Sequence, residues 1–253
     1  MRNIKLVMEY DGTNYAGWQS QNRRRPQAAG RRLGTIQETI EKTLQQILQE
    51  KIKLIASGRT YAGVHARDQA ANFNTNSNIS LERLQRALNG LLPQDIAVNR
   101  IEEADLDFHS RFSAKAKTYR YTILNRKYRS ALLRNNVYFY HHLLDLNLMQ
   151  KEAREILGKH DFKAFQAADK KARNPVKTIK KIKISKTGDL IYIDIEADGF
   201  LYNMVRNIVG TLIEIGRGKF PKGSLKKILL SKNRKMAGPT APARGLCLVK
   251  IKY

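Results

Sequence analysis

The feature that most constrains the fold is the segment 200–215, which is apolar on nearly every side of a helix. Its apolar members are Phe200, Leu201, Met204, Val205, Ile208, Val209, Leu212 and Ile213. A helix that is apolar all round must be covered on more than one side, which predicts a helix buried between layers of structure. Arg206 lies inside this segment. A buried guanidinium requires an anionic partner, unless the side chain snorkels to the edge of the helix.

Strand and helix patterns occur in the same order in both halves of the chain. In the first half we expect strands at 2–10, 51–56 and 96–101, and helices after the cap Ser80 and after Thr35, which forms a capping-box pattern with Glu38. In the second half we expect strands at 117–124, 176–185, 189–197 and 246–253, and helices at 145–158, 200–215 and 224–230. The helix after Ser80 is expected to bury Leu81, Leu84, Leu88 and Leu91. This order predicts an α+β fold of two similar α/β halves with mainly antiparallel sheets, at residues 1–105 and 106–253.

A large positive charge limits the classes of partner. Lys and Arg together number 47 and Asp and Glu number 22, which gives a formal net charge of +25. This excess predicts a polyanionic partner, either a nucleic acid or an anionic membrane surface. Residues 22–34 hold five arginines without helical or strand periodicity. We expect a basic loop there that suits phosphate contacts, although a solvated linker has the same composition.

A membrane span, a metal site and a cofactor are not expected. No stretch approaches 18 uninterrupted apolar residues. The N-terminus alternates like a strand and lacks the apolar core of a signal peptide, and the one cysteine, Cys247, is compatible with a reducing cytosol. We therefore expect a cytoplasmic protein. The five histidines lack the spacing of metal ligands, and the sequence patterns of P-loop, dinucleotide-binding, zinc-protease and serine-hydrolase sites are absent.

The segment 57–66, S-G-R-T-Y-A-G-V-H-A, combines small and polar residues. Gly58, Ala62 and Gly63 allow the backbone to bend closely around a ligand. Arg59 and His65 flank this bend and are candidates to contact that ligand. A tight turn with incidental polar residues has the same pattern, so both interpretations stay open at this point.

Eight motifs follow one another along the chain. They are Y-D-G at 10–12, G-W-Q at 17–19, G-R-T at 58–60 with A-G-V-H-A at 62–66, F-H-S-R at 108–111, K-T-Y-R-Y at 117–121, H-D-F at 160–162, F-L-Y-N-M-V-R at 200–206, and A-P-A at 241–243 with G-L at 245–246. In this order they resemble the motifs of the tRNA pseudouridine synthase A (TruA) family, and the resemblance covers residues 4–253. It implies two joined sheets with a central basic cleft and a homodimer that binds tRNA. It also implies isomerisation of uridine to pseudouridine at positions 38–40 of the anticodon stem-loop, without a metal or cofactor.

The same resemblance assigns roles to individual side chains. Tyr119 is expected to stack on the target base. Arg206 is expected to pair with the catalytic aspartate and to help open the RNA stack, which would supply the anion that a buried guanidinium requires. Arg59 and His65 are expected to bind the substrate.

The chain departs from the family at the residue on which the chemistry depends. The family loop reads G-R-T-D-A-G-V-H-A, and this chain has Tyr61 in place of the aspartate. A phenol has a reference pKa of about 10, so roughly one part in a thousand is ionised at pH 7, and its ring is larger than a carboxylate. We therefore expect a tRNA pseudouridine synthase that is inactive or crippled at Tyr61. One alternative is a non-catalytic tRNA-binding protein or RNA chaperone, and another is a basic ribosomal or membrane-surface protein.

Overall fold

The computed structural model describes residues 1–19, 34–168 and 174–253, and the chain divides into two compact units. The first unit holds Met1–Lys115 and Leu248–Tyr253, and the second holds Ala116–Cys247. The chain thus leaves the first unit after Lys115, whereas the sequence patterns predicted a division after residue 105. The C-terminal end of the chain belongs to the first unit again. Apart from Gly34, the arginine-rich segment 22–34 lies outside the described residues.

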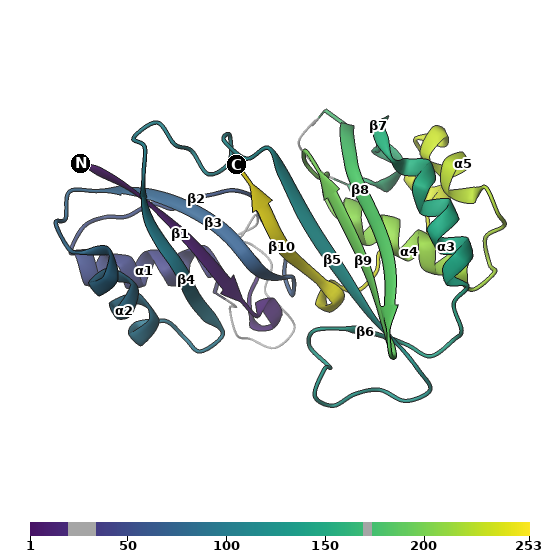
Figure 1. The fold of residues 1–253 in the computed structure, drawn as a ribbon, viewed down its shortest axis with the longest axis horizontal. Helices are drawn as coiled ribbons and strands as arrows, with labels where there is room; N and C mark the ends of the chain where they lie inside the picture. Colours follow the sequence, from purple (N-terminus) through teal and green to yellow (C-terminus); the bar gives the residue numbers. More distant parts are fainter. Residues whose placement is uncertain (20–33, 169–173) are drawn as a thin grey trace. The chain divides into compact units, whose positions relative to one another are not determined.

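The sheet of the first unit is antiparallel, with β1 (Arg2–Tyr10) between β3 (His65–Thr75) and β4 (Ile96–Ala104) (Figure 1). The two-residue strand β2 (Ile55–Ala56) pairs with β3, and β10 (Leu246–Lys252) follows β3 in the strand order. The strands expected at 2–10, 96–101 and 246–253 are confirmed by β1, β4 and β10.

Two helices complete the first unit, α1 (Ile36–Leu48) and α2 (Leu81–Leu91), and α1 packs against α2 while α2 packs against β4. The expected capping box of α1 is confirmed, because the Thr35 side chain accepts a hydrogen bond from the Glu38 amide and the Glu38 carboxylate accepts one from the Thr35 amide. Ser80 caps α2 as expected. The inward-facing core residues of these elements are Ile4, Leu6, Met8, Ile36, Ile40, Leu44, Leu84 and Leu88.

The apolar face of α2 is narrower than expected. Leu84 and Leu88 are buried, but Leu81 is half-buried and Leu91 is 50% exposed. At about 100° per residue, Leu81 and Leu91 point about 80° apart, so they lie on the two edges of the apolar stripe. The prediction that both are buried is therefore wrong.

The strand expected at 51–56 shrinks to its last two residues because side chains of α1 bind the preceding backbone. The Leu54 amide donates to Glu41 at 2.8 Å, and the Leu54 carbonyl accepts from Gln37 at 3.3 Å. The Ile52 carbonyl accepts from Gln45 at 3.3 Å. These three polar side chains, one turn apart on α1, satisfy backbone groups that a strand partner would otherwise bind.

In the second unit, antiparallel strands follow the order β5 (Ala116–Asn125), β9 (Leu190–Ala197), β8 (Val176–Thr187) and β7 (Gly158–Asp161). The short strand β6 (Tyr138–Tyr140) pairs with β5 in parallel. The hairpin expected around Gly188 is confirmed by the turn between β8 and β9, where Gly188 has φ 56°.

Three helices pack in this unit, α3 (Leu146–Ala153), α4 (Met204–Gly216) and α5 (Ser224–Ser231). Asp145 caps α3 as one of the two expected residues, but the helix ends five residues early, in a 3-10 turn that leads into β7. Every residue of α4 except Arg206 is buried, which confirms a buried helix in the apolar segment, although it begins four residues later than the expected 200–215 and ends at Gly216. The α+β class with mainly antiparallel strands is confirmed. Within the described ranges, none of the helices is long and apolar enough to cross a membrane.

Candidate functional site

The backbone of the 57–66 loop is bound by Gly17 and Trp18, in the segment that follows β1. Gly17 and Tyr61 form an isolated antiparallel bridge, and the Trp18 amide donates to the Thr60 carbonyl at 3.0 Å. Gly17 has φ 95°, and a Cβ at this position would lie 2.7 Å from the Thr60 carbonyl oxygen. Position 17 therefore needs glycine for both its backbone conformation and its close approach to the loop.

Buried side chains fix the loop from beneath. The Tyr10 hydroxyl and the Thr60 hydroxyl are 2.7 Å apart. Gln69 of β3 is fully buried, donates to the Gly58 carbonyl at 2.8 Å and accepts from the Ser57 hydroxyl at 2.7 Å. Strands β1 and β3 thus hold the loop through hydrogen bonds that leave little conformational freedom around position 61.

Arg59 and Tyr61 share the outward side of the loop. Thr60 is buried, whereas Arg59 is exposed and Tyr61 is half-buried. Arg59 and Tyr61 therefore flank a buried residue and are themselves accessible to solvent in whole or in part. The structure thus brings these two predicted site residues together at one surface of the first unit.

His65, at the other end of the loop, is 5% exposed. Its Nδ1 accepts from the Gly12 amide at 3.2 Å and lies 3.1 Å from Oδ1 of Asp11. Burial alone would raise the pKa of Asp11, but hydrogen bonds from Thr13 and the nearby His65 ring together lower it. The ring therefore ties the end of the loop to the turn after β1.

Gly12 makes that turn possible, because a Cβ there would lie 2.1 Å from the Val64 carbonyl oxygen. We expect Gly12→Ala to lower the free energy of unfolding by about 1–3 kcal/mol, since backbone must move to admit the methyl group. Gly90→Ala in α2 is the control: nothing lies within 4 Å of its added Cβ, and we expect it to stabilise the protein by up to about 1 kcal/mol. Urea unfolding measures both, and equal stability of the two variants would contradict the close approach.

Tyr119 lies on β5 in the second unit. It shares a strand face with the fully buried Tyr121 and Ile123, but is itself half-buried. Its ring packs edge-on against Phe200 with centroids 5.1 Å apart. On the opposite strand face, Arg120 forms a two-bond ion pair with Asp194 of β9 at 2.7 and 2.9 Å. The Tyr119 ring is therefore partly exposed, with Phe200 as an aromatic neighbour.

Arg206 lies in the first turn of α4. Its Nε donates to the Ala241 carbonyl at 2.6 Å, and its Nη1 donates to Oδ1 of Asn203 at 3.2 Å. Burial lowers the pKa of this guanidinium. In the part of the chain that the structure describes, no carboxylate forms an ion pair with Arg206. The anion that a partly buried guanidinium requires is thus left to another group.

Polar residues inside α4 bind the segment 234–240, which leads to the Ala241 carbonyl that Arg206 contacts. Asn207 is fully buried, and its Oδ1 accepts from the Thr240 hydroxyl at 2.6 Å and from Arg234 at 3.0 Å. The Thr211 hydroxyl accepts from the Gly238 amide at 2.9 Å. The sequence analysis missed both residues. Their signal was two polar side chains one turn apart in an otherwise apolar helix.

Among residues 1–19, 34–168 and 174–253, no group of three or more His, Cys, Asp or Glu side chains is placed to hold a metal ion.

The predicted site residues lie in two sets: Arg59, Tyr61 and His65 in the first unit, and Tyr119 and Arg206 in the second.

Comparison with known proteins matches most of the chain. The family model described as tRNA pseudouridine synthase matches residues 6–113 and 153–253, which include position 61 and Arg206 but not Tyr119. The protein named tRNA pseudouridine synthase A from Acetivibrio thermocellus is 47% identical over 253 residues, and the protein of the same name from Clostridium acetobutylicum is 46% identical over 253 residues. tRNA pseudouridine synthase A 2 from Clostridium perfringens is 47% identical over 254 residues. Each alignment covers the whole of both chains.

Proposed function

Because the chain belongs to the tRNA pseudouridine synthase family, we propose that it binds tRNA and that Tyr61 leaves it inactive, or severely crippled, as a synthase. The uridines concerned are those at positions 38–40 of the anticodon stem-loop. The observation that carries the proposal is the intact scaffold at position 61. Gly17 and Trp18 bind the loop backbone, yet the side chain at this position is a phenol where the family has a carboxylate.

The reaction explains why this one position matters. Isomerisation breaks the bond from C1′ to N1 of uracil, forms a bond from C1′ to C5 and moves a proton from C5 to N1, so no atom is gained or lost. A carboxylate can act as the nucleophile toward the ribose or the ring, or as the base for the C5 proton. At its ordinary pKa of about 10, a phenol supplies roughly a thousandth as much anion at pH 7. Its ring also takes up space next to the loop that a carboxylate leaves open.

The other site residues receive roles in the same reaction. Arg59 is exposed beside Tyr61 and suits an RNA phosphate, and the half-buried ring of Tyr119 suits stacking on the target base. Arg206 has hydrogen-bond partners but no carboxylate in the described residues, which supports a role toward an anion or a displaced nucleotide. His65 is buried, so we assign it to hold the loop rather than to reach the RNA on its own.

Binding of unmodified tRNA tests the RNA part of the proposal. With six to ten phosphate contacts, we expect affinity to fall by about 10³–10⁵-fold between 50 and 200 mM salt. Fluorescence anisotropy of labelled tRNA across this salt range measures the slope of log K against log [salt]. A slope near zero would argue against backbone contacts and hence against tRNA as the ligand.

Incubation of the same tRNA with the unaltered protein tests the catalytic part. We expect no pseudouridine at positions 38–40 above the no-enzyme background, as measured by nucleoside mass spectrometry. We also propose that the protein is cytoplasmic and forms a homodimer, as the resemblance implies. Light scattering after gel filtration tests the homodimer. Binding without catalysis is what a tRNA chaperone would also show, and replacement of Tyr61 separates the two functions.

A further inference from the structure

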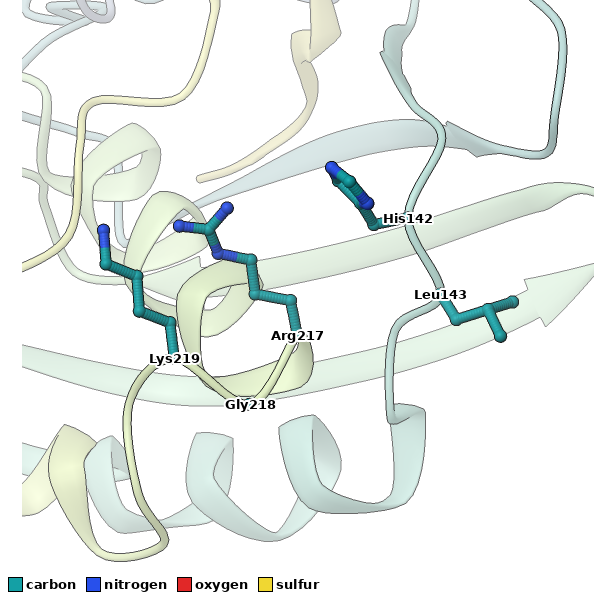
Figure 2. Close-up of a pocket in the computed structure, with 5 residues that line it drawn as sticks. All are labelled: His142, Leu143, Arg217, Gly218 and Lys219. Carbon is teal, nitrogen blue, oxygen red and sulfur yellow. The ribbon is translucent and has the colours of Figure 1, made fainter.

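A polar pocket lies at the far end of α4 from Arg206, entirely within the second unit. It has a volume of about 380 Å³ and is lined by His142, Leu143, Arg217, Gly218 and Lys219. Figure 2 shows the Arg217 guanidinium between the Lys219 ammonium and the His142 ring, all extending to the same side, whereas Leu143 points elsewhere. Three nitrogen-bearing groups therefore converge on one space.

Hydrogen bonds fix the backbone of both walls of the pocket. Gly218 has φ 79°, and the amides of Arg217 and Gly218 donate to α4 carbonyls at Ile213 and Ile215. The Lys219 amide donates to the Glu214 carbonyl at 2.9 Å. On the other wall, a single side chain fixes the chain after β6, because the Asn125 amide donates to the carbonyls of Tyr140 at 2.9 Å and His142 at 2.7 Å. The cationic groups thus start from fixed backbone positions.

The charges in the pocket do not cancel. Glu214 is buried, and one of its oxygens serves both cations, at 2.7 Å from Arg217 and 3.3 Å from Lys219. One carboxylate can neutralise one of these side chains, so one positive charge is left over. If these cations served only to cap α4 and to pair with Glu214, Arg217 alone would be enough and Lys219 would not be needed.

The ring next to His142 belongs to Tyr140, whose buried hydroxyl forms no hydrogen bond within the described residues. Tyr140 is 8% exposed, and in the described part of the chain its hydroxyl makes no hydrogen bond of acceptable geometry. Its ring packs against His142 with centroids 5.6 Å apart. A buried hydroxyl without a partner is a feature that a bound oxyanion or its water can satisfy.

We propose that Arg217, Lys219 and His142 bind a phosphate of the tRNA backbone, at a position separate from the nucleotide that meets Arg206. Eleven residues of helix separate Arg206 from Arg217, which corresponds to about 17 Å along α4. An RNA phosphate is the anion favoured by the net charge of +25 and by membership of a tRNA-modifying family. This inference rests on the proposed binding of tRNA and adds a second contact to it.

Lys219→Gln tests the pocket, and the chain offers a matched control. The Lys219 side chain is 61% exposed and lies 3.3 Å from a glutamate oxygen; the Lys226 side chain is 62% exposed and also lies 3.3 Å from a glutamate oxygen, but does not line the pocket. We expect Lys219→Gln to weaken tRNA binding about 3–10-fold and to reduce the salt slope by about 1. Lys226→Gln should change affinity less than 2-fold, and Lys219→Arg should retain most of it.

Several results would overturn the inference. If the unaltered protein binds tRNA but Lys219→Gln and Lys226→Gln behave alike, the pocket does not contact RNA, whereas failure of the unaltered protein to bind tRNA contradicts the proposed function itself. A change in molar mass of Lys219→Gln in light scattering would assign the pocket to an interface between copies. NMR shifts of His142 with millimolar inorganic phosphate, together with unchanged tRNA affinity of Lys219→Gln, would assign it to a free anion. Because both lysines are exposed, we expect each variant to unfold at the same midpoint as the unaltered protein, and this is checked first.

Discussion

Replacement of Tyr61 by aspartate is expected to raise pseudouridine synthase activity far above that of the unaltered protein, which we propose to be inactive or severely crippled. The loop that would carry the new carboxylate is already held by hydrogen bonds to its backbone from Trp18 and Gln69, by the Gly17–Tyr61 bridge and by the hydroxyl pair of Tyr10 and Thr60. A carboxylate with a pKa near 4 is almost fully ionised at pH 7, against roughly one part in a thousand for a phenol. We therefore expect a rate increase of at least about 10³-fold, to which removal of the ring adds.

The assay separates charge from space. Unmodified tRNA is incubated with the unaltered protein and with Tyr61→Asp, and pseudouridine at positions 38–40 is measured by nucleoside mass spectrometry. Tyr61→Asn is the matched control, because it removes the ring without adding a carboxylate. We expect activity with Asp and none with Asn, while all three proteins bind tRNA within a few-fold of one another.

Each other outcome has a definite meaning. Full activity of the unaltered protein would show that the carboxylate is dispensable and that the account of Tyr61 is wrong. Inactivity of both the unaltered protein and Tyr61→Asp, with tRNA binding retained, would favour a tRNA-binding protein without catalysis. Equal activity of Tyr61→Asp and Tyr61→Asn would mean that the ring blocks the uridine and that the charge is not needed.

Sequence patterns predict well the features that residues close in the chain build between themselves. The capping box of Thr35 and Glu38 needs only one turn of helix, and the apolar run that forms α4 identifies its own burial. The residues of the 57–66 loop are contiguous, so their motif could be recognised as a unit. In each case the partner of a residue lies within a few positions of it.

Contacts between distant residues could not be predicted in the same way. Gln69 is a polar residue that β3 buries completely, and its burial is explained only by Gly58 and Ser57, which bind it. Arg206 was predicted to need a partner, but the Ala241 carbonyl, 35 residues away, carries no signal in its side chain. A polar residue at an apolar position indicates that a partner exists, without indicating which group it is.

Loss of Arg206 is expected to impair catalysis far more than tRNA binding. In the Tyr61→Asp background, we expect Arg206→Met to lower the single-turnover rate of pseudouridine formation by about 10²–10³-fold, as for other preorganised donors at reacting charge. Extraction of a base from its stack costs a few kcal/mol, and a guanidinium held by Ala241 and Asn203 is placed to offset part of that cost. Affinity for tRNA, which many phosphate contacts share, should fall less than about 5-fold.

Arg206→Lys distinguishes charge from geometry. Lysine keeps the positive charge but cannot donate to the Ala241 carbonyl and to a second anion through a fixed planar group. We therefore expect it to recover tRNA affinity but to leave the rate at least about 10-fold below that of Tyr61→Asp alone. A full recovery of rate would reduce the role of Arg206 to a simple point charge.

Stability provides a third, independent measurement of the same residue. Arg206 carries a partly buried charge without a carboxylate among the described residues, so its removal relieves a desolvation cost. Arg206→Met also leaves the buried Ala241 carbonyl without its donor, which opposes that gain. We expect the free energy of unfolding to change by less than about 1 kcal/mol in urea titrations. A large loss of stability would show that Arg206 holds α4 together, and equal losses of rate and tRNA affinity would show that it only binds; either result would remove it from the catalytic step.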